Sequence, residues 1–249
     1  MNVCVFDTET TSLVKPFCYN IGLVIGNTES GEILCKREWV VEQIWHNEPL
    51  FSTAYYAEKR PIYVNRMRSR QVSLDKWGYI MQRMNRLFKE YEVSAIYAYN
   101  SPFDEKVLSF NCEWFKTQNP LELYPIFDIR GYVHKKLAWL KDFQKFCEEN
   151  SFFTESGNYS TTAETVFRYL KKDIEFKEEH TALSDTVIEW EILKKCIELS
   201  AEWNKDYKVY SSIPRKQIKE LELIHEDERY IFPYEKIRIN KDKTKIILK

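Results

Sequence analysis

The stretch Val3-Cys4-Val5-Phe6-Asp7-Thr8-Glu9 places two acids inside an otherwise apolar segment. Side chains of a β-strand alternate between its two faces, so both carboxylates are expected to point the same way. Like charges held side by side repel each other unless a cation lies between them. Hard oxygen ligands on a rigid strand suit a divalent metal such as Mg²⁺ or Mn²⁺. The stretch therefore predicts a strand that begins a metal site.

Composition limits the classes of protein that remain. The chain has 249 residues, of which 44% are hydrophobic, enough for one large domain or one domain with an appendage. A net charge of −1 excludes a protein that coats nucleic acid nonspecifically through a basic surface, so any such contact must be local. Six scattered cysteines without a CxxC pair predict reduced, packed thiols and neither disulfides nor a zinc site.

No segment reads as a signal peptide or as a membrane span. The apolar start meets Asp7 at once, and no apolar run approaches the ~20 residues that a spanning helix needs. We expect a soluble, cytoplasmic protein without membrane contacts, of a kind that would suit a bacterium or a bacteriophage.

The pattern along the chain predicts strands first and helices later. After the first strand, further strands are expected at Tyr19–Gly26, Ile33–Val41, Ser94–Tyr99 and Pro125–Ile129. Helical spacing of apolar residues favours helices over Trp77–Tyr91, Ser101–Phe115, Leu137–Cys147, Thr162–Leu170 and Thr181–Trp203. Ser101 is predicted to cap its helix, with Pro102 at the first helical position.

This order predicts an α/β fold. Its mixed five-stranded sheet would combine a three-strand antiparallel meander with parallel strands, flanked by helices. The main domain is expected to span residues 1–204. A C-terminal extension over 205–249 would hold a short helix at Arg215–Leu223 and a lysine-rich, strand-like stretch at Lys236–Leu248. That stretch is interpreted as a protected edge strand, or else as a contact for a partner or nucleic acid.

A further acid lies where a predicted strand ends and a helix begins. Asp104 belongs to Asn100-Ser101-Pro102-Phe103-Asp104. In open α/β sheets this edge is where ligands bind. The alternative is that Asp104 only complements the dipole of the helix from its first turn.

The third segment with chemical potential is His180-Thr181-Ala182-Leu183-Ser184-Asp185. Asp185 begins an apolar stripe that continues through Ile188 and Ile192, so its carboxylate needs a ligand or a partner. His180 precedes the helix and is free to turn towards the same site, although a lone histidine there is more often a surface residue. Four carboxylates and a histidine can hold two divalent cations ~4 Å apart and hydrolyse a phosphodiester, with the histidine taking a proton from water.

These three segments resemble the three exonuclease motifs of the DEDDh (DnaQ-like) 3′–5′ exonuclease family, in the same order and with four residues between histidine and last aspartate. The resemblance covers roughly residues 1 to 200 and not the tail. It implies an RNase H-like fold, two Mg²⁺ or Mn²⁺ ions and release of nucleoside 5′-monophosphates. It further implies that the metal ligands are Asp7, Glu9, Asp104 and Asp185, and that His180 is the general base.

The same resemblance implies the residues that contact substrate. Thr10 and Leu13 would lie against the terminal nucleotide, with Asn100 and Phe103 lining the same pocket. Ser12 departs from the motif, where glycine is common. Asp128, at another strand end, is interpreted as a structural acid, with contact to the site as the alternative.

One basic segment has two interpretations. Lys59–Arg70 interleaves Tyr63 with four arginines and a lysine. Such a segment would suit a groove that follows a single nucleic-acid strand. A solvated loop or helix face is the alternative.

The leading hypothesis is a metal-dependent 3′–5′ exonuclease acting on single-stranded DNA or RNA with a free 3′ end. A polymerase or another replication or repair protein is a further candidate partner. The alternative class is a non-catalytic adaptor that binds nucleic acid or a polymerase with the same fold, whose mark would be a missing acid. An endonuclease on a related fold is disfavoured because the histidine five residues before the last acid is typical of the exonucleases.

Overall fold

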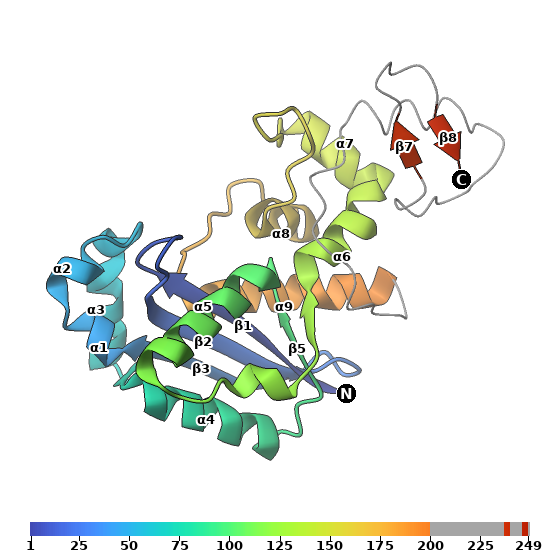
Figure 1. Ribbon diagram of the computed structural model, residues 1–249. Coiled ribbons are helices and arrows are strands. Elements are labelled where there is room, and N and C mark those ends of the chain that lie inside the picture. The colour runs from blue at the N-terminus through green and yellow to red at the C-terminus, as the bar shows by residue number, and fades with distance from the viewer. Residues whose placement is uncertain (200–236, 240–245, 249) are drawn as a thin grey trace.

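The computed structural model describes residues 1–199 in full and the backbone of 237–239 and 246–248 (Figure 1). Its main sheet has six strands in the order β4-β3-β2-β1-β5-β6. The strands are β1 (Asn2–Thr10), β2 (Cys18–Asn27), β3 (Ile33–Val41), β4 (Ser73–Asp75), β5 (Ala95–Ala98) and β6 (Ile126–Asp128).

Strand directions confirm the predicted mixed sheet. β1, β2 and β3 form the antiparallel meander, whereas β5 and β6 continue the sheet parallel to β1. The strand count differs from the prediction, because β4 adds a sixth strand parallel to β3. β4 holds a single apolar residue, Leu74, so it lacks the apolar run by which the equally short β6 was predicted.

The predicted helices are present with small shifts in their ends. They are α4 (Trp77–Glu90), α5 (Ser101–Phe115), α7 (Lys141–Glu149), α8 (Ala163–Lys171) and α9 (Ala182–Leu199). Before α7, a separate turn, η3 (Leu137–Trp139), occupies the start of the expected helix. Ser101 was expected to cap α5, but the capping residue is Asn100 in the left-handed conformation and Ser101 is the first helical residue.

Several short helices were not predicted from the sequence. They are α1 (Glu42–Trp45), α2 (Glu48–Phe51), α3 (Arg60–Arg68) and α6 (Ile129–Lys135), with turns η1 (Ala57–Lys59) and η2 (Pro120–Leu123). Each has fewer than ten residues, and isolated helices of that length are marginal in water. Their stability therefore comes from packing, which periodicity does not reveal.

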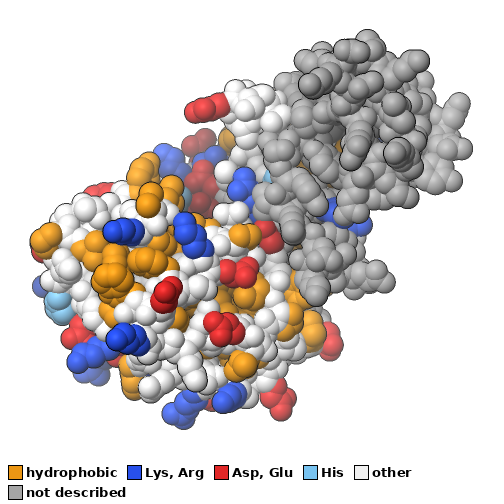
Figure 2. Space-filling model, viewed as in Figure 1, with side chains coloured by type: hydrophobic (Ala, Val, Ile, Leu, Met, Phe, Trp, Pro, Cys, Tyr) orange, Lys and Arg blue, Asp and Glu red, His pale blue; other side chains and the backbone are white. Residues whose placement is uncertain are grey.

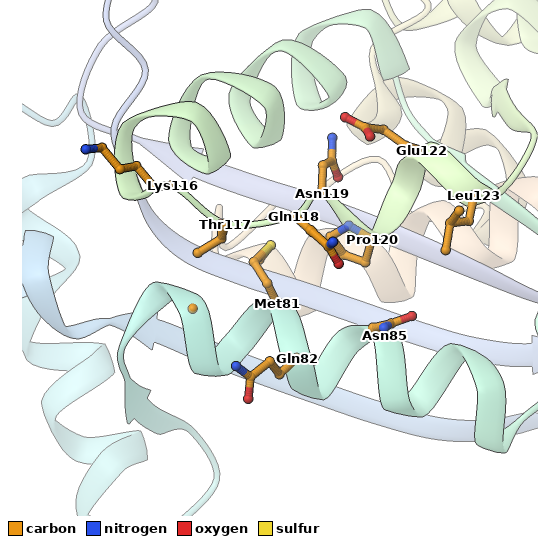
Figure 3. Close-up of a pocket in the computed structure, with 11 residues that line it drawn as sticks. Met81, Gln82, Asn85, Lys116, Thr117, Gln118, Asn119, Pro120, Glu122 and Leu123 are labelled. Carbon is orange, nitrogen blue, oxygen red and sulfur yellow. The ribbon is translucent and has the colours of Figure 1, made fainter.

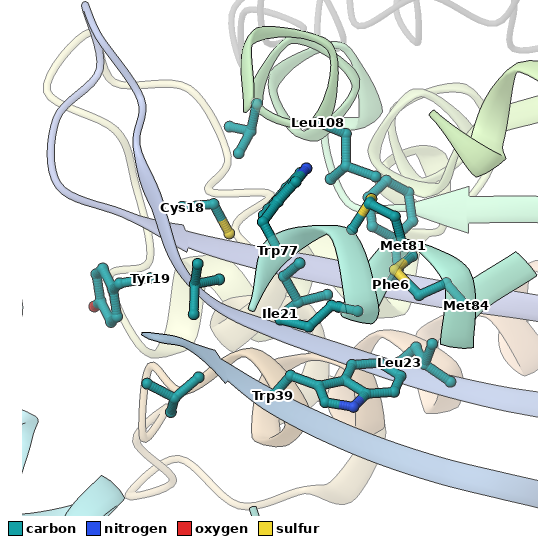
Figure 4. Packing of buried hydrophobic residues seen from close by; sticks show 14 of the residues in the cluster. Phe6, Cys18, Tyr19, Ile21, Leu23, Trp39, Trp77, Met81, Met84 and Leu108 are labelled. Atoms are coloured by element: carbon teal, nitrogen blue, oxygen red, sulfur yellow. The ribbon is translucent and has the colours of Figure 1, made fainter. Parts of the chain in front are cut away.

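Hydrophobic clusters lie on both faces of the sheet. In β1, Cys4 and Phe6 belong to the cluster that α4 and α5 cover, and Val3 and Val5 belong to the cluster of α6, α7, α8 and α9. Figure 4 shows the first cluster, in which Phe6 lies close to Met81 and Met84 of α4. Asp7 and Glu9 share the odd positions of Val3 and Val5, so the alternation directs both acids towards the α9 layer.

The strand-like stretch predicted in the C-terminal extension is confirmed only in part. β7 (Ile237–Ile239) and β8 (Ile246–Leu248) form an antiparallel pair within the lysine-rich stretch. The predicted helix at Arg215–Leu223 lies outside the described residues, and so does the end of the helix expected to reach Trp203. The division into domains at residue 204 remains a prediction.

The structure shows the state of the six cysteines and the hydrophobicity of the helices, both of which were predicted from the sequence. All six cysteines are free and buried, as predicted. Among the residues that the structure describes, no helix is both long and apolar enough to cross a membrane.

Candidate metal centre

Three carboxylates converge at the carboxyl end of β1. Asp7 and Glu9 from that strand and Asp185 from the first turn of α9 each offer one oxygen atom, and these atoms lie within 4.8 Å of one another. Two ligands placed ~2.1 Å from one Mg²⁺ ion lie at most about 4.2 Å apart, so this spacing is close to that of a coordination shell. The donors are hard oxygens, and the residues present fit a divalent cation.

Close packing of α9 on β2 brings Asp185 to this position. Gly22 is the register partner of Asp7. A Cβ atom at Gly22 would lie 2.2 Å from the carbonyl carbon of Ala182, so only glycine lets the start of α9 approach the sheet. The amide of Ala182 also donates to Oδ1 of Asn20, at 2.8 Å. The start of α9 is therefore fixed against β2, beside the two acids of β1.

Asp104 reaches the site from the other layer. It is 2% exposed in the first turn of α5, and its Oδ1 accepts from the hydroxyl of Thr8 at 2.6 Å and from the amide of Thr8 at 3.1 Å. Its charge raises the pKa of Asp7, an effect second only to burial. Asp104 thus lies beside the other acids but outside the group of three whose oxygens share 4.8 Å.

Burial raises the pKa values of these carboxyl groups above their ordinary range. It raises the pKa of Asp104 and of Asp185 to about 7 and that of Glu9 to about 9. The pKa of Asp7 also lies well above its ordinary range, because of burial first and the charge of Asp104 second. A bound cation would remove both causes, since it replaces solvent and neutralises the repulsion.

This electrostatic coupling predicts that Mg²⁺ stabilises the protein more at pH 8.5 than at pH 6. Because the folded-state pKa values exceed the unfolded ones, the folded chain binds extra protons from about pH 4 up to about pH 7 for Asp104 and Asp185 and about pH 9 for Glu9. The stability of the metal-free protein should fall as pH rises through that window. At high pH, fewer protons compete with the ion.

Thermal unfolding with Mg²⁺ or EDTA at the two pH values measures this difference. An ion at 100 times its Kd adds about 2.7 kcal/mol. That corresponds to a rise of about 5–10 °C in Tm for a chain of this length. An equal rise at both pH values would contradict the coupling.

His180 lies in the turn before α9, half-buried and with a φ of +52°. Its ring stacks on Tyr56, with centroids 4.6 Å apart and planes 11° from parallel. Its Nδ1 is 3.6 Å from Oε2 of Glu178. Burial and then the nearby charge of Lys59 lower the pKa of His180, so the imidazole is neutral at physiological pH. A neutral imidazole is able to accept a proton.

The basic segment Lys59–Arg70 is mainly a brace for the His180 turn. Lys59 donates to the carbonyl of Glu179. Arg66 pairs with Glu179 at 2.6 Å and donates to the hydroxyl of Thr181 at 3.0 Å. Tyr63 is fully buried. Lys59 of η1 and Arg66 of α3 therefore hold the turn, whereas Arg68 and Arg70 are exposed, and the interpretation as a groove for a nucleic-acid strand stays a prediction.

The residues expected to contact substrate lie on β1, on the loop that follows it and at the start of α5. Thr10 ends β1, Leu13 follows in an exposed loop, and Asn100 and Phe103 lie half-buried at the start of α5. Ser12 needs no glycine-like conformation, since its φ is not positive, and its Oγ bridges the amide and the carbonyl of Lys15.

Asp128 has the structural role that was predicted for it. Its Oδ1 accepts from the amide of Arg130 at 2.9 Å, which caps α6, and from the amide of Asn100 at 3.0 Å. The second bond fixes the left-handed residue that precedes α5. Asp128 therefore supports the backbone next to Asp104.

Sequence reasoning missed one acid. Glu189 is 3% exposed, and within the described part of the chain its Oε2 has no hydrogen-bond partner. Burial, together with the charges of Asp104 and Asp185, raises its pKa well above the ordinary range. It follows Asp185 by one helical turn, and that four-residue spacing was the available signal.

A separate pocket lies away from these acids. It is formed between α4 and the segment that follows α5, and Figure 3 shows Met81 and Asn85 of α4 facing Thr117, Asn119 and Pro120. None of the candidate ligands lines it.

The mixed sheet with helices on both faces is an RNase H-like fold, which confirms the predicted fold class with six strands instead of five. No protein-family model matches the sequence, and no curated protein matches it. Solved structures do match. The nuclease domain of 3'hExo, a DEDDh family member bound to rAMP, has 14% identity and a TM-score of 0.54, over 85% of this chain and 97% of that one.

Two further structures have similar scores. A 3'-exonuclease bound to a histone mRNA stem-loop has 14% identity and a TM-score of 0.51, over 86% of this chain and 92% of its own. Exonuclease I of E. coli, in complex with a dT13 oligonucleotide, has 14% identity and a TM-score of 0.51, over 80% of this chain and 41% of its own. The chain shares the fold of DEDDh exonucleases, as the three motifs predicted.

Proposed function

We propose that this chain is a metal-dependent 3′–5′ exonuclease that hydrolyses nucleic acid from a free 3′ end to nucleoside 5′-monophosphates. The observation that carries the proposal is the convergence of Asp7, Glu9 and Asp185 within 4.8 Å, on the fold of known exonucleases. Asp104 acts on the pKa of Asp7, and His180 precedes α9, the helix that carries Asp185. The adaptor alternative loses support because no acid of the set is missing.

The proposed ligands are Asp7, Glu9, Asp104 and Asp185. Two Mg²⁺ or Mn²⁺ ions held there would supply an activated water and would stabilise the leaving oxygen of an in-line displacement. Oδ1 of Asp104 accepts two hydrogen bonds from Thr8, so the position of this carboxylate depends on the backbone of β1. On binding metal, Asp104 would either keep these bonds or replace them with a bond to the ion. The raised pKa values fit this role, because sites that lack a counter-charge are the ones that gain most from a cation.

His180 is the proposed general base. Its lowered pKa keeps the imidazole free to take the proton of the attacking water, and the stack on Tyr56 limits the orientations of the ring. Glu178, whose Oε2 is 3.6 Å from Nδ1, would stabilise the protonated ring in its ionised form, and burial raises the pKa of Glu178 to about 8. Thr10, Leu13, Asn100 and Phe103 are the proposed contacts of the terminal nucleotide.

One assay tests the reaction. Single-stranded DNA and RNA oligomers, labelled at the 5′ or the 3′ end, are incubated with Mg²⁺, Mn²⁺ or EDTA. We expect stepwise shortening of the 5′-labelled strands and immediate release of a labelled mononucleotide from the 3′-labelled ones, both abolished by EDTA. Internal cuts would instead indicate an endonuclease. Metal-dependent binding without cleavage would support the adaptor.

The variant His180→Ala tests the base. General-base catalysis contributes about 10²- to 10⁴-fold, so kcat should fall by that factor. The rise in Tm with Mg²⁺ should remain, because His180 is not a proposed ligand. His46→Ala, at an exposed histidine, is the control and should keep full activity. Full activity in His180→Ala would show that another group takes the proton.

A further inference from the structure

Three aromatic side chains form a surface cluster beyond the metal centre. Phe17 contacts Phe110 and Trp114 edge-on, each at a centroid distance of 5.1 Å, and Phe110 stacks on Trp114 at 6.3 Å. Trp114 is nevertheless 61% exposed. We name Phe17, Phe110 and Trp114 the aromatic platform.

Two exposed apolar residues lie in the loop that leads to Phe17. In the loop after β1, Leu13 is 74% exposed and Val14 is 83% exposed. Figure 2 shows hydrophobic side chains gathered on the face that carries α5, with Lys and Arg side chains beside them. Contiguous exposed apolar surface on a folded protein marks a binding site more often than scattered exposed residues do.

The platform and its loop are held in place before any ligand binds. Nζ of Lys106 donates to the carbonyl of Leu13 at 3.2 Å. The side-chain amide of Asn111 is buried. Its Nδ2 donates to the carbonyl of Pro16 at 2.7 Å, and its Oδ1 accepts from the backbone amide of Cys18 at 3.2 Å. Because these bonds tie the loop to α5, little conformational entropy is lost when a ligand binds there.

Position along α5 relates the platform to the reaction. Asp104 lies in the first turn of α5 and Trp114 ten residues later. At a rise of 1.5 Å per residue, the two are about 15 Å apart along the helix axis. Stacked nucleotides advance about 3.4 Å each, so a strand with its 3′ end at the centre reaches the platform within about five nucleotides.

The basic residues near the aromatic platform indicate which kind of ligand it binds. Lys15 lies in the loop before Phe17, and Lys106 of α5 donates from Nζ to the carbonyl of Leu13 in the same loop. Aromatic rings with lysines around them are the combination by which proteins bind single strands, because bases stack and phosphates pair with the cations. The two lysines on the loop and helix that carry the rings favour a phosphate-bearing strand over an uncharged apolar partner.

We propose that the aromatic platform binds unpaired bases upstream of the 3′ terminus, so that the protein prefers single strands of at least about five nucleotides. The proposal rests on the proposed exonuclease function for the direction of the strand. Trp114 would act as a binding residue away from the reacting atoms, and its loss should affect long substrates alone.

Binding and turnover of two substrate lengths test the platform. Anisotropy of 5′-labelled dT12 and dT3 is measured in Ca²⁺, and kcat and KM for both are measured in Mg²⁺. For Trp114→Ala we expect Kd and KM for dT12 to rise about tenfold or more, in line with ~1–3 kcal/mol per stacked base. The values for dT3 and both kcat values should stay unchanged. Trp114→Phe should restore most of the affinity.

Leu123→Ala is the matched control, since Leu123 is an apolar side chain 72% exposed that lines the separate pocket of Figure 3. It should bind both oligomers like the wild type. Unchanged dT12 binding in Trp114→Ala would overturn the proposal and leave the surface to a protein partner. An equal loss for dT3 and dT12 would also overturn it. Failure of the wild type to cleave either oligomer refutes the exonuclease function, whereas the anisotropy measurement still tests the platform.

Discussion

Asp7→Asn is expected to remove nuclease activity while leaving the metal-free protein at least as stable as the wild type. Asp7 contributes one of the three oxygens that lie within 4.8 Å of one another, so its replacement removes a proposed metal ligand. It also removes one of several buried like charges, since Asp104, Glu189, Asp185 and Glu9 all raise the pKa of Asp7. Catalysis and stability should therefore change in opposite directions, as is common at functional sites.

The expected loss of activity is large. Removing a single group that stabilises developing charge in an active site costs about 10²–10³ in kcat. A lost metal ligand should cost at least that much, because both the activated water and the leaving-group stabilisation depend on the ions. The measurements are exonuclease rate in Mg²⁺ and Tm in EDTA at pH 8, above the raised pKa values of Asp104 and Asp185.

An acid of the same type supplies the control. Asp142 is exposed at the start of α7, far along the chain from the cluster, so Asp142→Asn should change neither the rate nor the rise in Tm with Mg²⁺. Two results would contradict the assignment of Asp7. One is wild-type activity in Asp7→Asn, and the other is an undiminished Mg²⁺-dependent rise in Tm.

Gly22→Ala is expected to destabilise the fold and disable the site together. The added Cβ would lie 2.2 Å from the carbonyl carbon of Ala182 and 2.3 Å from the amide nitrogen of Leu183. Both atoms are backbone, so the start of α9 must move as a unit. That movement would displace His180 and Asp185, which flank Ala182 on either side.

Overpacking costs typically about 1–3 kcal/mol, and a clash with backbone should fall at the upper end. For a chain of this length, that predicts a fall in Tm of about 6–12 °C. Loss of activity should exceed what the fall in Tm explains at assay temperature. Thermal unfolding and exonuclease rate, measured on the same preparation well below Tm, separate the two effects.

Gly78→Ala is the matched control. Gly78 lies in α4, and a Cβ there would meet only Cγ2 of Thr117 at 3.4 Å, an ordinary contact. Alanine also has the higher helix propensity by about 1 kcal/mol. Gly78→Ala should therefore be neutral or stabilising and fully active. Wild-type Tm and activity in Gly22→Ala would show that α9 does not depend on this close approach.

Sequence periodicity predicted the long elements and missed the short ones. β1, β2, β3 and the helices α4, α5, α8 and α9 follow from alternation, helical spacing and caps. β4, α1 and α2 have at most four residues each, too few to carry a pattern, and α3, although as long as α8, buries only Tyr63 and so lacks an apolar stripe. For α5, the Asp128 side chain fixes Asn100 as the capping residue, and no rule about neighbouring residues contains that contact.

The sequence by itself determined the chemistry of the candidate site. Alternation placed Asp7 and Glu9 on one face of β1, and the three motifs predicted the fold that the solved exonucleases share. These features are local, because strand and helix periods act over a few residues.

Tertiary structure alone decided which distant residues meet. Asp185 joins Asp7 and Glu9 because glycine lets α9 approach β2, and the tie between Asp104 and Thr8 crosses 96 positions. Glu189 is buried, with its pKa raised by the charges of Asp104 and Asp185, and the aromatic platform joins Phe17 of the loop after β1 to Trp114 of α5. Such contacts depend on how layers pack, since side-chain burial and ring contacts arise between segments that are far apart in the chain.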